Sequence, residues 1–196
     1  IPDRGGTVQE LTLIPRPLYP YETWQAITSP PTLEVVPKRG WGGVFWNSHP
    51  TFIKSQWDRF AELYEESQNQ SLESGEKRML VRCVCVADTY EEAVESVRPG
   101  HDEFWKFLGP YGWSKGYMGP DGKPSKAGLI PTLEDSLEQK IWIVGSADDV
   151  GEQIEWYRDL LGVENLMLFP MMPGDSYESG TDQLHRLAED VLPKFT

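Results

Sequence analysis

An alternation of short apolar runs with helical patterns is the feature of this sequence that most constrains its fold. Four times, a run with strand-like composition is followed by a segment with helical spacing or a helix-start signal. The four runs are residues 23–28, 43–46, 79–87 and 166–169. Regular alternation of this kind is typical of a parallel sheet with crossover helices, so we expect the α/β class, with helices on one side of the sheet.

The helices are predicted from spacing and from residues typical of helix ends. After residues 43–46, Pro50 stands where a first helical residue would, with Ser48 or His49 as its cap. Apolar side chains then recur at helical spacing; they are Ile53, Trp57, Phe60 and Tyr64. The other expected helices are 32–36, a helix capped by Asp88 or Thr89 that Pro99 interrupts and 104–108 continues, one from Ser146 to Gly162, and 181–191. Residues 1–22 carry four prolines and predict an extended segment.

Composition and charge exclude several classes of protein. The chain has 18 basic and 31 acidic residues, a net charge of −13, which argues against nucleic acid or an anionic membrane as its partner. No apolar run approaches the ~20 residues of a membrane span. Cys83 and Cys85 would share one face of a strand, where a disulfide is disfavoured, so we expect buried free thiols. With no recognisable signal peptide, these features predict a cytoplasmic protein.

Five stretches resemble the bacterial luciferase-like, flavin-dependent monooxygenase family, in the family's own order. The first, LTLIPRP with TWQAITSPPT, resembles the fifth barrel strand and its phosphate-binding turn. KRGWGGVFW resembles the sixth strand, and VRCVCVADTYEEAVE the seventh strand with its helix start. IVGSADDVGEQIEWYRDLLGVENLMLF resembles a helix followed by the eighth strand, and LAEDVLPKF the closing helix. Nothing resembles the family's first four strands.

This resemblance implies a single domain over residues 1–196 that is the C-terminal half of a (β/α)8 barrel. Four strand–helix units cannot close an eight-stranded barrel, which takes about 250 residues. The family's activity implies a monooxygenase that uses reduced FMN, supplied by a separate flavin reductase, and dioxygen on a small organic substrate. Two alternatives are a deazaflavin-dependent oxidoreductase of the same fold and a catalytically incompetent half-barrel fragment. Unpaired strand edges predict a homo-oligomer, or association with a missing N-terminal half.

Three hydroxyl side chains are the candidate cofactor-binding residues. Thr28, Ser29 and Thr32 stand between a strand and the following helix, where N–H groups and the helix dipole favour an anion. The resemblance places hydroxyls at these positions on the FMN phosphate, although Pro30 and Pro31 remove two amide donors. The alternative is that Ser29 or Thr32 only caps a helix.

Trp46 ends the second strand, followed by Asn47, at the end of a barrel where active sites lie. The resemblance implies that Trp46 lies beside the flavin ring. The alternative is that its indole only fills the core, as most buried aromatic rings do.

Residues 109–131 hold six glycines and four prolines in 23 positions and predict a long mobile loop. The resemblance implies a substrate lid here that excludes water, with Tyr111, Trp113 and Tyr117 as its aromatic residues. The alternative is a disordered surface loop without a role.

No catalytic residue or metal site is predicted. His49, His101 and His185 are far apart in the sequence, and each is expected to be a helix cap or a surface residue.

Overall fold

The computed structural model describes residues 17–126 and 128–195, which form a sheet of five parallel strands. The strands are β1 (Trp24–Ala26), β2 (Gly42–Trp46), β3 (Arg78–Val86), β4 (Ile143–Gly145) and β5 (Asn165–Phe169). The parallel α/β prediction is confirmed, and β1, β2, β3 and β5 are the four predicted strands. The number four is wrong, because β4 was missed: three residues between a loop and a helix cap are too few to show a period. Of the expected extended segment, residues 1–16 lie outside the described residues.

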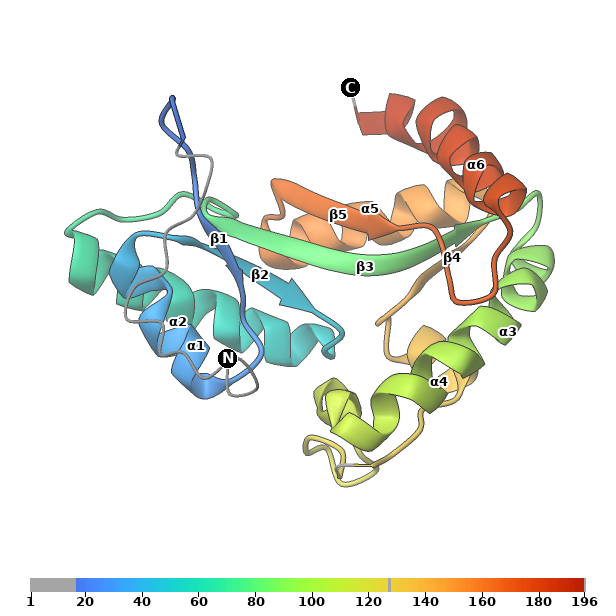
Figure 1. Cartoon of the computed structure of the whole chain (residues 1–196), viewed down its shortest axis with the longest axis horizontal. Helices are drawn as coiled ribbons and strands as arrows, with labels where there is room; N and C mark the ends of the chain where they lie inside the picture. Colours follow the sequence, from blue (N-terminus) through green and yellow to red (C-terminus); the bar gives the residue numbers. More distant parts are fainter. Residues whose placement is uncertain (1–16, 127, 196) are drawn as a thin grey trace, which may run out of the picture.

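The long strand β3 is the centre of the sheet (Figure 1). Its first part pairs with β2 through residues 78–81 and with β5 through residues 79–83. Its last part, residues 84–86, pairs with β4. Strand β1 pairs with β2. Three different strands therefore depend on β3 for their backbone hydrogen bonds.

In the described part of the chain, six α-helices follow the strands, and most begin at the predicted caps. They are α1 (Pro30–Val35), α2 (Pro50–Gln68), α3 (Tyr90–Leu108), α4 (Leu133–Glu138), α5 (Ala147–Leu161) and α6 (Tyr177–Arg186), the last continuing into a π-helical turn (Leu187–Val191) and a 3-10 turn (Leu192–Phe195). Ser29, His49, Thr89 and Ser146 each cap a helix through a side-chain acceptor. Within the described residues, no helix has the length and apolarity to cross a bilayer.

Two helix predictions need correction. Pro99 does not interrupt its helix, because α3 runs through it. Pro99 and Glu95, whose carbonyl loses its N–H partner, are both exposed, while the buried side chains of Val97 and Trp105 hold the helix on both sides of the proline. Helix α4 was not predicted at all, since its six residues are too short to display a helical period.

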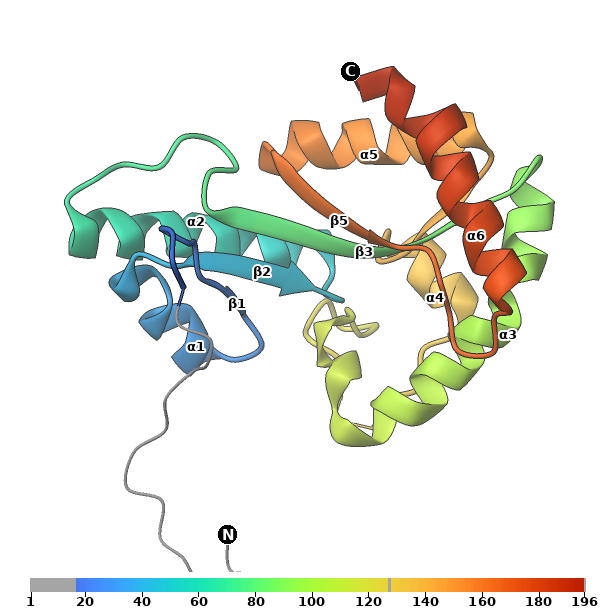
Figure 2. The same ribbon diagram turned by 45° about the horizontal axis from the view of Figure 1, so that its top comes forward.

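The side chains form two buried clusters on opposite faces of β3. Leu80, Val84 and Val86 of β3 pack with α2, α5 and the π-helical turn after α6. Cys83 and Cys85 face the other way and pack with α3 and α4. Figure 2 shows α5 above β3, and α3 and α4 below its far end. The expectation of helices on one side is therefore wrong for the carboxyl-terminal part of β3, because the long segment after that strand folds back over its other face.

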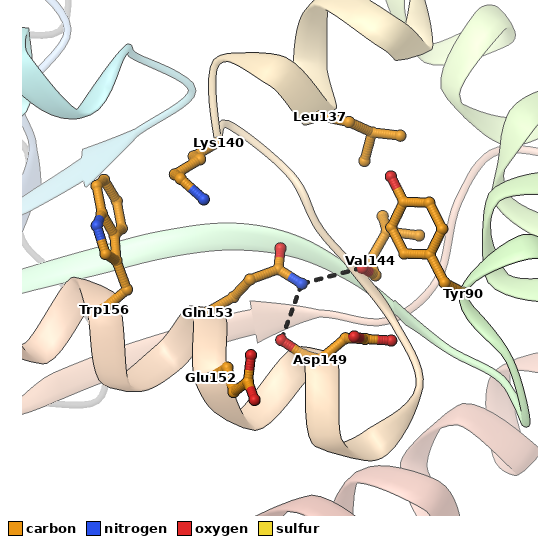
Figure 3. A pocket seen from close by; sticks show the side chains of 8 residues that line it. All are labelled: Tyr90, Leu137, Lys140, Val144, Asp149, Glu152, Gln153 and Trp156. Carbon is orange, nitrogen blue, oxygen red and sulfur yellow. Dashed lines mark hydrogen bonds between the residues drawn. The ribbon is translucent and has the colours of Figure 1, made fainter.

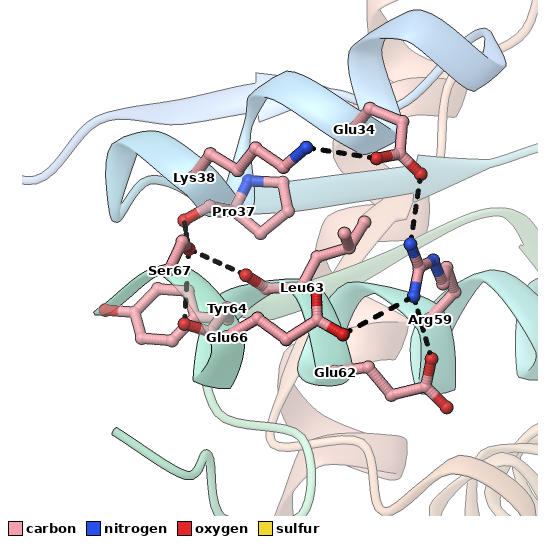
Figure 4. A network of polar contacts seen from close by, with 9 residues as sticks. All are labelled: Glu34, Pro37, Lys38, Arg59, Glu62, Leu63, Tyr64, Glu66 and Ser67. Carbon is pink, nitrogen blue, oxygen red and sulfur yellow. Dashed lines mark hydrogen bonds and ion pairs between the residues drawn. The ribbon is translucent and has the colours of Figure 1, made fainter. Parts of the chain in front are cut away.

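The helix that follows β1 is held in place by polar contacts with α2 (Figure 4). The Arg59 guanidinium pairs with Glu34 of α1 at 3.5 Å and with Glu62 at 3.1 Å. The Ser67 hydroxyl donates to the Pro37 carbonyl at 3.4 Å, just beyond α1. These contacts fix the position of the turn that begins at Ser29.

Candidate functional site

The candidate residues of β1 and β2 lie at the carboxyl ends of two adjacent parallel strands. Ser29 follows β1 by three positions and Trp46 is the last residue of β2, and the two strands are hydrogen-bonded neighbours. In parallel sheets the carboxyl ends of the strands meet at one edge, where binding sites form. The structure therefore places these candidates at the same edge of the sheet.

The hydroxyls of Ser29 and Thr32 are in contact with each other. Their oxygen atoms are 3.2 Å apart, and Thr32 Oγ1 donates to the Ser29 carbonyl at 2.8 Å. Thr32 Oγ1 also accepts from the backbone N–H groups of Thr28 and Ser29, at 3.2 and 3.0 Å. The expected helix cap is therefore present, and it brings all three candidate residues into one hydrogen-bonded turn.

This turn keeps some capacity to bind an anion. The hydroxyl of Thr28, an exposed residue, has no hydrogen bond within the described residues, and Ser29 Oγ can turn from Thr32 towards a ligand. No acidic side chain lies in the first turn of α1. Pro30 and Pro31 supply no N–H groups, so a phosphate here depends on hydroxyl donors. The hydroxyl groups of Thr28 and Ser29 are donors that fit a phosphate group.

Trp46 lies among aromatic side chains from three other segments. Its ring is 5.8 Å from that of Phe104, 5.6 Å from Trp113 and 6.2 Å from Phe169, with which it stacks. Trp46 is half-buried and Phe169 is 44% exposed. The aromatic group is therefore open on one side to a planar ligand.

Asn47 and His49 continue the chain beyond Trp46. Asn47 is buried, with a left-handed backbone (φ 50°) and no hydrogen bond to its side-chain amide within the described part of the chain. His49 Nδ1 accepts from the Thr51 N–H at 3.2 Å, which leaves Nε2 to carry the proton of the neutral ring. Burial, together with the charge of Arg82, lowers the pKa of His49. His49 is thus a neutral cap, as expected, and also lines a cavity.

The three expected lid residues occupy different environments. Tyr111 is exposed, Trp113 is 38% exposed beside Trp46, and Tyr117 is fully buried. The segment folds into two 3-10 turns, Gly109–Tyr111 and Trp113–Gly116, and then a hairpin with a bridge between Met118 and Pro124. Its mobility and its contact with a substrate stay predictions.

The hairpin is tied to α4 by two side chains. The Gln139 amide accepts from the Met118 N–H at 2.7 Å and donates to the Met118 carbonyl at 3.2 Å, as a neighbouring strand would. The Tyr117 hydroxyl contacts Ser136 Oγ at 2.6 Å. Between the hairpin, α4 and His49 lies a cavity of about 1020 Å³. Tyr117 therefore anchors the segment that walls this cavity.

His101 is not a cap or surface residue, and that prediction is wrong. Its ring is fully buried against Trp142, with Nε2 2.8 Å from Ser136 Oγ and Nδ1 3.2 Å from Asp102. Burial lowers its pKa, and Asp102 opposes that shift. The burial of His101 could not be predicted from the sequence, because its partner Ser136 lies on helix α4, which was not predicted either. His185, in contrast, is exposed as expected.

The two cysteines are buried free thiols, as predicted. Burial raises the pKa of Cys83 to about 12 and that of Cys85 to about 11. Neither sulfur is therefore a thiolate at neutral pH, and both serve packing.

Arg82 is a fully buried cation that sequence reasoning did not single out. Its guanidinium donates to the Tyr157 hydroxyl at 2.8 Å and to the Ser48 carbonyl at 3.0 Å. It also lies over the Tyr157 ring, 4.9 Å from the ring centre. Among the described residues, no carboxylate forms an ion pair with it. A lone arginine in the apolar run MLVRCVCVA was the available signal.

A smaller cavity of about 380 Å³ lies beside the first turns of α5 (Figure 3). Lys140 and Trp156 form one wall, and Tyr90 the other. Gln153 Nε2 donates to the carbonyls of Val144 and Asp149, both at 3.0 Å, so its amide nitrogen already serves the fold. No predicted site residue lines this cavity. The described residues also contain no group of three or more His, Cys, Asp or Glu side chains placed to hold a metal ion.

The comparison with protein families shows to which family the chain belongs. The model of the luciferase-like monooxygenases matches residues 4–164, most of the sequence. The chain belongs to the luciferase-like monooxygenase family. The match covers the Ser29 turn, Trp46 and the segment after β3, while β5 with Phe169 and helix α6 lie beyond it. A search of curated proteins finds no significant relative.

Solved structures of two monooxygenases and a reductase share the fold. The oxygenating constituent of 3,6-diketocamphane monooxygenase from Pseudomonas putida, in complex with FMN, has a TM-score of 0.68 at 20% identity over 87% of this chain and 47% of its own. The monooxygenase RslO1 from Streptomyces bottropensis has a TM-score of 0.64 at 15% identity, over 89% and 48%. The coenzyme F420-dependent tetrahydromethanopterin reductase from Methanopyrus kandleri has a TM-score of 0.55 at 16% identity, over 88% and 50%. The chain thus spans about half the length of these proteins.

Proposed function

We propose that this chain carries part of the flavin site of a luciferase-like monooxygenase that uses reduced FMN and dioxygen on a small organic substrate. The observation that supports this most directly is that the hydroxyl turn of Thr28, Ser29 and Thr32 and the open aromatic group around Trp46 follow neighbouring strands. Both lie at the edge where parallel α/β proteins bind ligands. Reduced FMN would come from a separate flavin reductase.

Each part of this edge has a task in the proposed function. The Thr28 and Ser29 hydroxyls would donate to the FMN phosphate, which the neutral first turn of α1 does not repel. Trp46 and Phe169 would contact the ring of the flavin. Bound flavin supplies the electron-transfer and oxygen chemistry, while the protein orients the substrate and excludes water. The aromatic residues Tyr111 and Trp113 would take part in excluding water. Tyr117 would anchor their segment through its contact with Ser136 of α4.

A charge placed in the hydroxyl turn tests the phosphate contact. In the Ser29→Asp variant, the helix cap is retained because aspartate caps helices as well as serine does. The new carboxylate would repel a phosphate, and we expect FMN affinity to fall at least about tenfold, roughly 1.4 kcal/mol. Flavin fluorescence titration measures this, with FMN and with riboflavin, which lacks the phosphate and should show little change.

The matched control is Ser176→Asp, at the cap of α6, which changes the same residue type in the same role far from the turn. It should leave FMN affinity unchanged. Equal FMN affinity in the Ser29→Asp variant and the wild type would move the phosphate elsewhere, and a chain that binds no flavin in any form would overturn the proposed function.

Two alternatives make different predictions in the same assay. A deazaflavin also carries a phosphate that the hydroxyl turn could bind, and the solved structures that share this fold include an F420-dependent enzyme. Tight binding of F420 and weak binding of FMN would favour that cofactor, with hydride transfer in place of oxygenation. A half-barrel that is catalytically incompetent would bind neither cofactor and would only self-associate.

A further inference from the structure

The cavity beside α5 is separate from the edge of the sheet that carries the proposed flavin site. Its volume of about 380 Å³ is within the range of small-molecule sites, about 300–1,000 Å³. Its lining comes from the start of α3, from α4 and the residues after it, from β4 and from α5 (Figure 3). No residue of the Ser29 turn or of the aromatic group around Trp46 belongs to this lining. A ligand in this cavity would therefore not compete with a flavin.

Two charged side chains of opposite sign line the cavity without an ionic partner. The Lys140 ammonium lies over the Trp156 ring, 5.1 Å from the ring centre, and forms no ion pair within the described residues. The Glu152 carboxylate has no ion pair or hydrogen bond there either. Asp149 differs, because its carboxylate accepts from the N–H and the hydroxyl of Ser146, at 2.9 and 2.7 Å. The charges that remain unpaired complement a molecule that carries both a carboxylate and an ammonium group.

The amide of Gln153 adds a hydrogen-bond acceptor of fixed orientation. Its nitrogen donates to the carbonyls of Val144 and Asp149, both at 3.0 Å, which uses both of its N–H bonds. The amide cannot turn over without losing these two bonds, so its oxygen points the other way, into the cavity (Figure 3). In the part of the chain that the structure describes, no donor reaches this oxygen. An acceptor next to the carboxylate of Glu152 favours an ammonium group as ligand.

Lys140 occupies a backbone position at which glycine is the usual residue. Its φ of 53° is left-handed, directly after the C-cap of α4. Its carbonyl accepts from the buried Tyr157 hydroxyl, and its N–H donates to the Leu137 carbonyl at 3.0 Å. The backbone is thus fixed at this point, and the Trp156 ring holds the side chain at the cavity. The ammonium is therefore already in position to bind a carboxylate.

The rest of the lining offers apolar and aromatic surface. Leu137 and Val144 contribute aliphatic groups, and the Tyr90 ring, which is 44% exposed, lies across the cavity from Trp156 (Figure 3). Such surfaces cover an apolar or aromatic group of a ligand. A free amino acid with an apolar side chain combines a carboxylate, an ammonium group on the neighbouring carbon, and a group of this kind.

We propose that this cavity binds a free α-amino acid with an apolar side chain. Lys140 pairs with the carboxylate of the amino acid, while Glu152 and the Gln153 oxygen bind its ammonium group. The side chain of the amino acid packs on Tyr90 and Leu137. The inference goes beyond the proposed function and does not depend on it, because none of these residues has a task at the flavin site.

Isothermal titration calorimetry with L-phenylalanine tests the site. The wild-type chain should bind L-phenylalanine at least about tenfold more tightly than N-acetyl-L-phenylalanine, which has no ammonium group, and L-phenylalanine methyl ester, which has no carboxylate. Lys140→Gln removes the cation and keeps a side chain of similar length. It should weaken binding of L-phenylalanine at least about tenfold and leave binding of the methyl ester unchanged or stronger. Glu152→Gln should weaken binding of L-phenylalanine but not of the N-acetyl derivative.

The matched controls are Lys106→Gln and Glu155→Gln, which neutralise exposed charges of α3 and α5 outside the cavity. Both should keep the wild-type affinity for L-phenylalanine, and circular dichroism checks that each variant is folded. The proposal would be overturned by a wild-type chain that binds no L-phenylalanine at millimolar concentration, or by unchanged affinity in Lys140→Gln and Glu152→Gln. Equal affinity for either derivative would also contradict it. Because no flavin is present in these titrations, such results would leave the proposed function standing.

Discussion

At the residue scale, Arg82 shows how a buried charge can be kept without a counter-charge. Its partners are the Tyr157 hydroxyl, the carbonyls of Val81 and Ser48, and the face of the Tyr157 ring. Tyr157 in turn donates to the Lys140 carbonyl. A buried cation without a carboxylate depends on every neutral acceptor that faces it, so loss of one acceptor is costly. We expect Tyr157→Phe to lower the free energy of unfolding by about 1–3 kcal/mol.

A double-mutant cycle separates this contact from the general loss of a hydroxyl. In an Arg82→Met background, Tyr157→Phe should cost clearly less, because no guanidinium is left unpaired. Urea denaturation of the four proteins gives the coupling free energy. The exposed Tyr177→Phe serves as the control and should change stability by less than about 0.5 kcal/mol. A coupling free energy near zero would show that Arg82 does not depend on Tyr157.

At the element scale, His101 links α3 to α4 and to the hairpin through Ser136 and Tyr117. Burial lowers the pKa of folded His101, whereas the pKa of an unfolded histidine is about 6.5. Below that pH the unfolded chain therefore binds more protons than the folded one. The contribution of neutral His101 to the stability of the fold is fully present above a pH of about 6.5 and is lost as the pH falls below it.

We therefore expect the free energy of unfolding to fall between pH 7 and pH 5.5, and to fall less in a His101→Gln variant. Urea denaturation across this range measures the two slopes. His185→Gln changes an exposed histidine and should keep the wild-type slope. Identical slopes for His101→Gln and the wild type would remove His101 as the cause.

At the scale of the whole molecule, the described residues leave one face of the sheet uncovered at β5. Leu166 and Leu168 of β5 pack into the larger core, so Met167 and Phe169 face the opposite way and are 43% and 44% exposed. Among the described residues, β1 pairs only with β2 and β5 only with β3, which leaves one edge of each unpaired. Open edges beside an apolar face favour association with another copy or with a complementary half-barrel.

We expect the isolated chain to form dimers or larger species at micromolar concentration. Met167→Lys, which places a charge on the uncovered face, should shift the distribution towards monomer in sedimentation velocity experiments. Leu184→Lys is the control, since Leu184 is exposed on α6 in the segment after β5. A monomer at every concentration would contradict the expected self-association.

The sequence predicts those parts of the structure that have a local period or a local cap, and fails where tertiary contacts decide. The Ile53–Tyr64 spacing and the caps at Thr89 and Ser146 depend on neighbours in the chain, and the structure confirms them. The short elements β4 and α4 depend on pairing with β3 and packing on α3, so no local pattern indicates them.

The candidate site divides in the same way. The Ser29–Thr32 turn is visible in the sequence because its hydrogen bonds are local. In contrast, the burial of Asn47 requires residues 113–116, and that of His101 requires residue 136, neither of which is near in the chain. Spacing rules cannot reveal such pairs, because they compare only residues a few positions apart.

The position of β3 between two cores has a consequence for how this molecule can come apart. Alternate side chains of the strand belong to different cores, and those of β4 do the same, with Ile143 in one and Val144 in the other. If either core separated from β3, water would reach the apolar side chains of the strand on which the other core also depends. Partial opening would therefore cost almost as much free energy as complete unfolding. The part of the chain with the two cores should therefore behave as one cooperative unit, in which the slowest amide protons to exchange with solvent belong to β3.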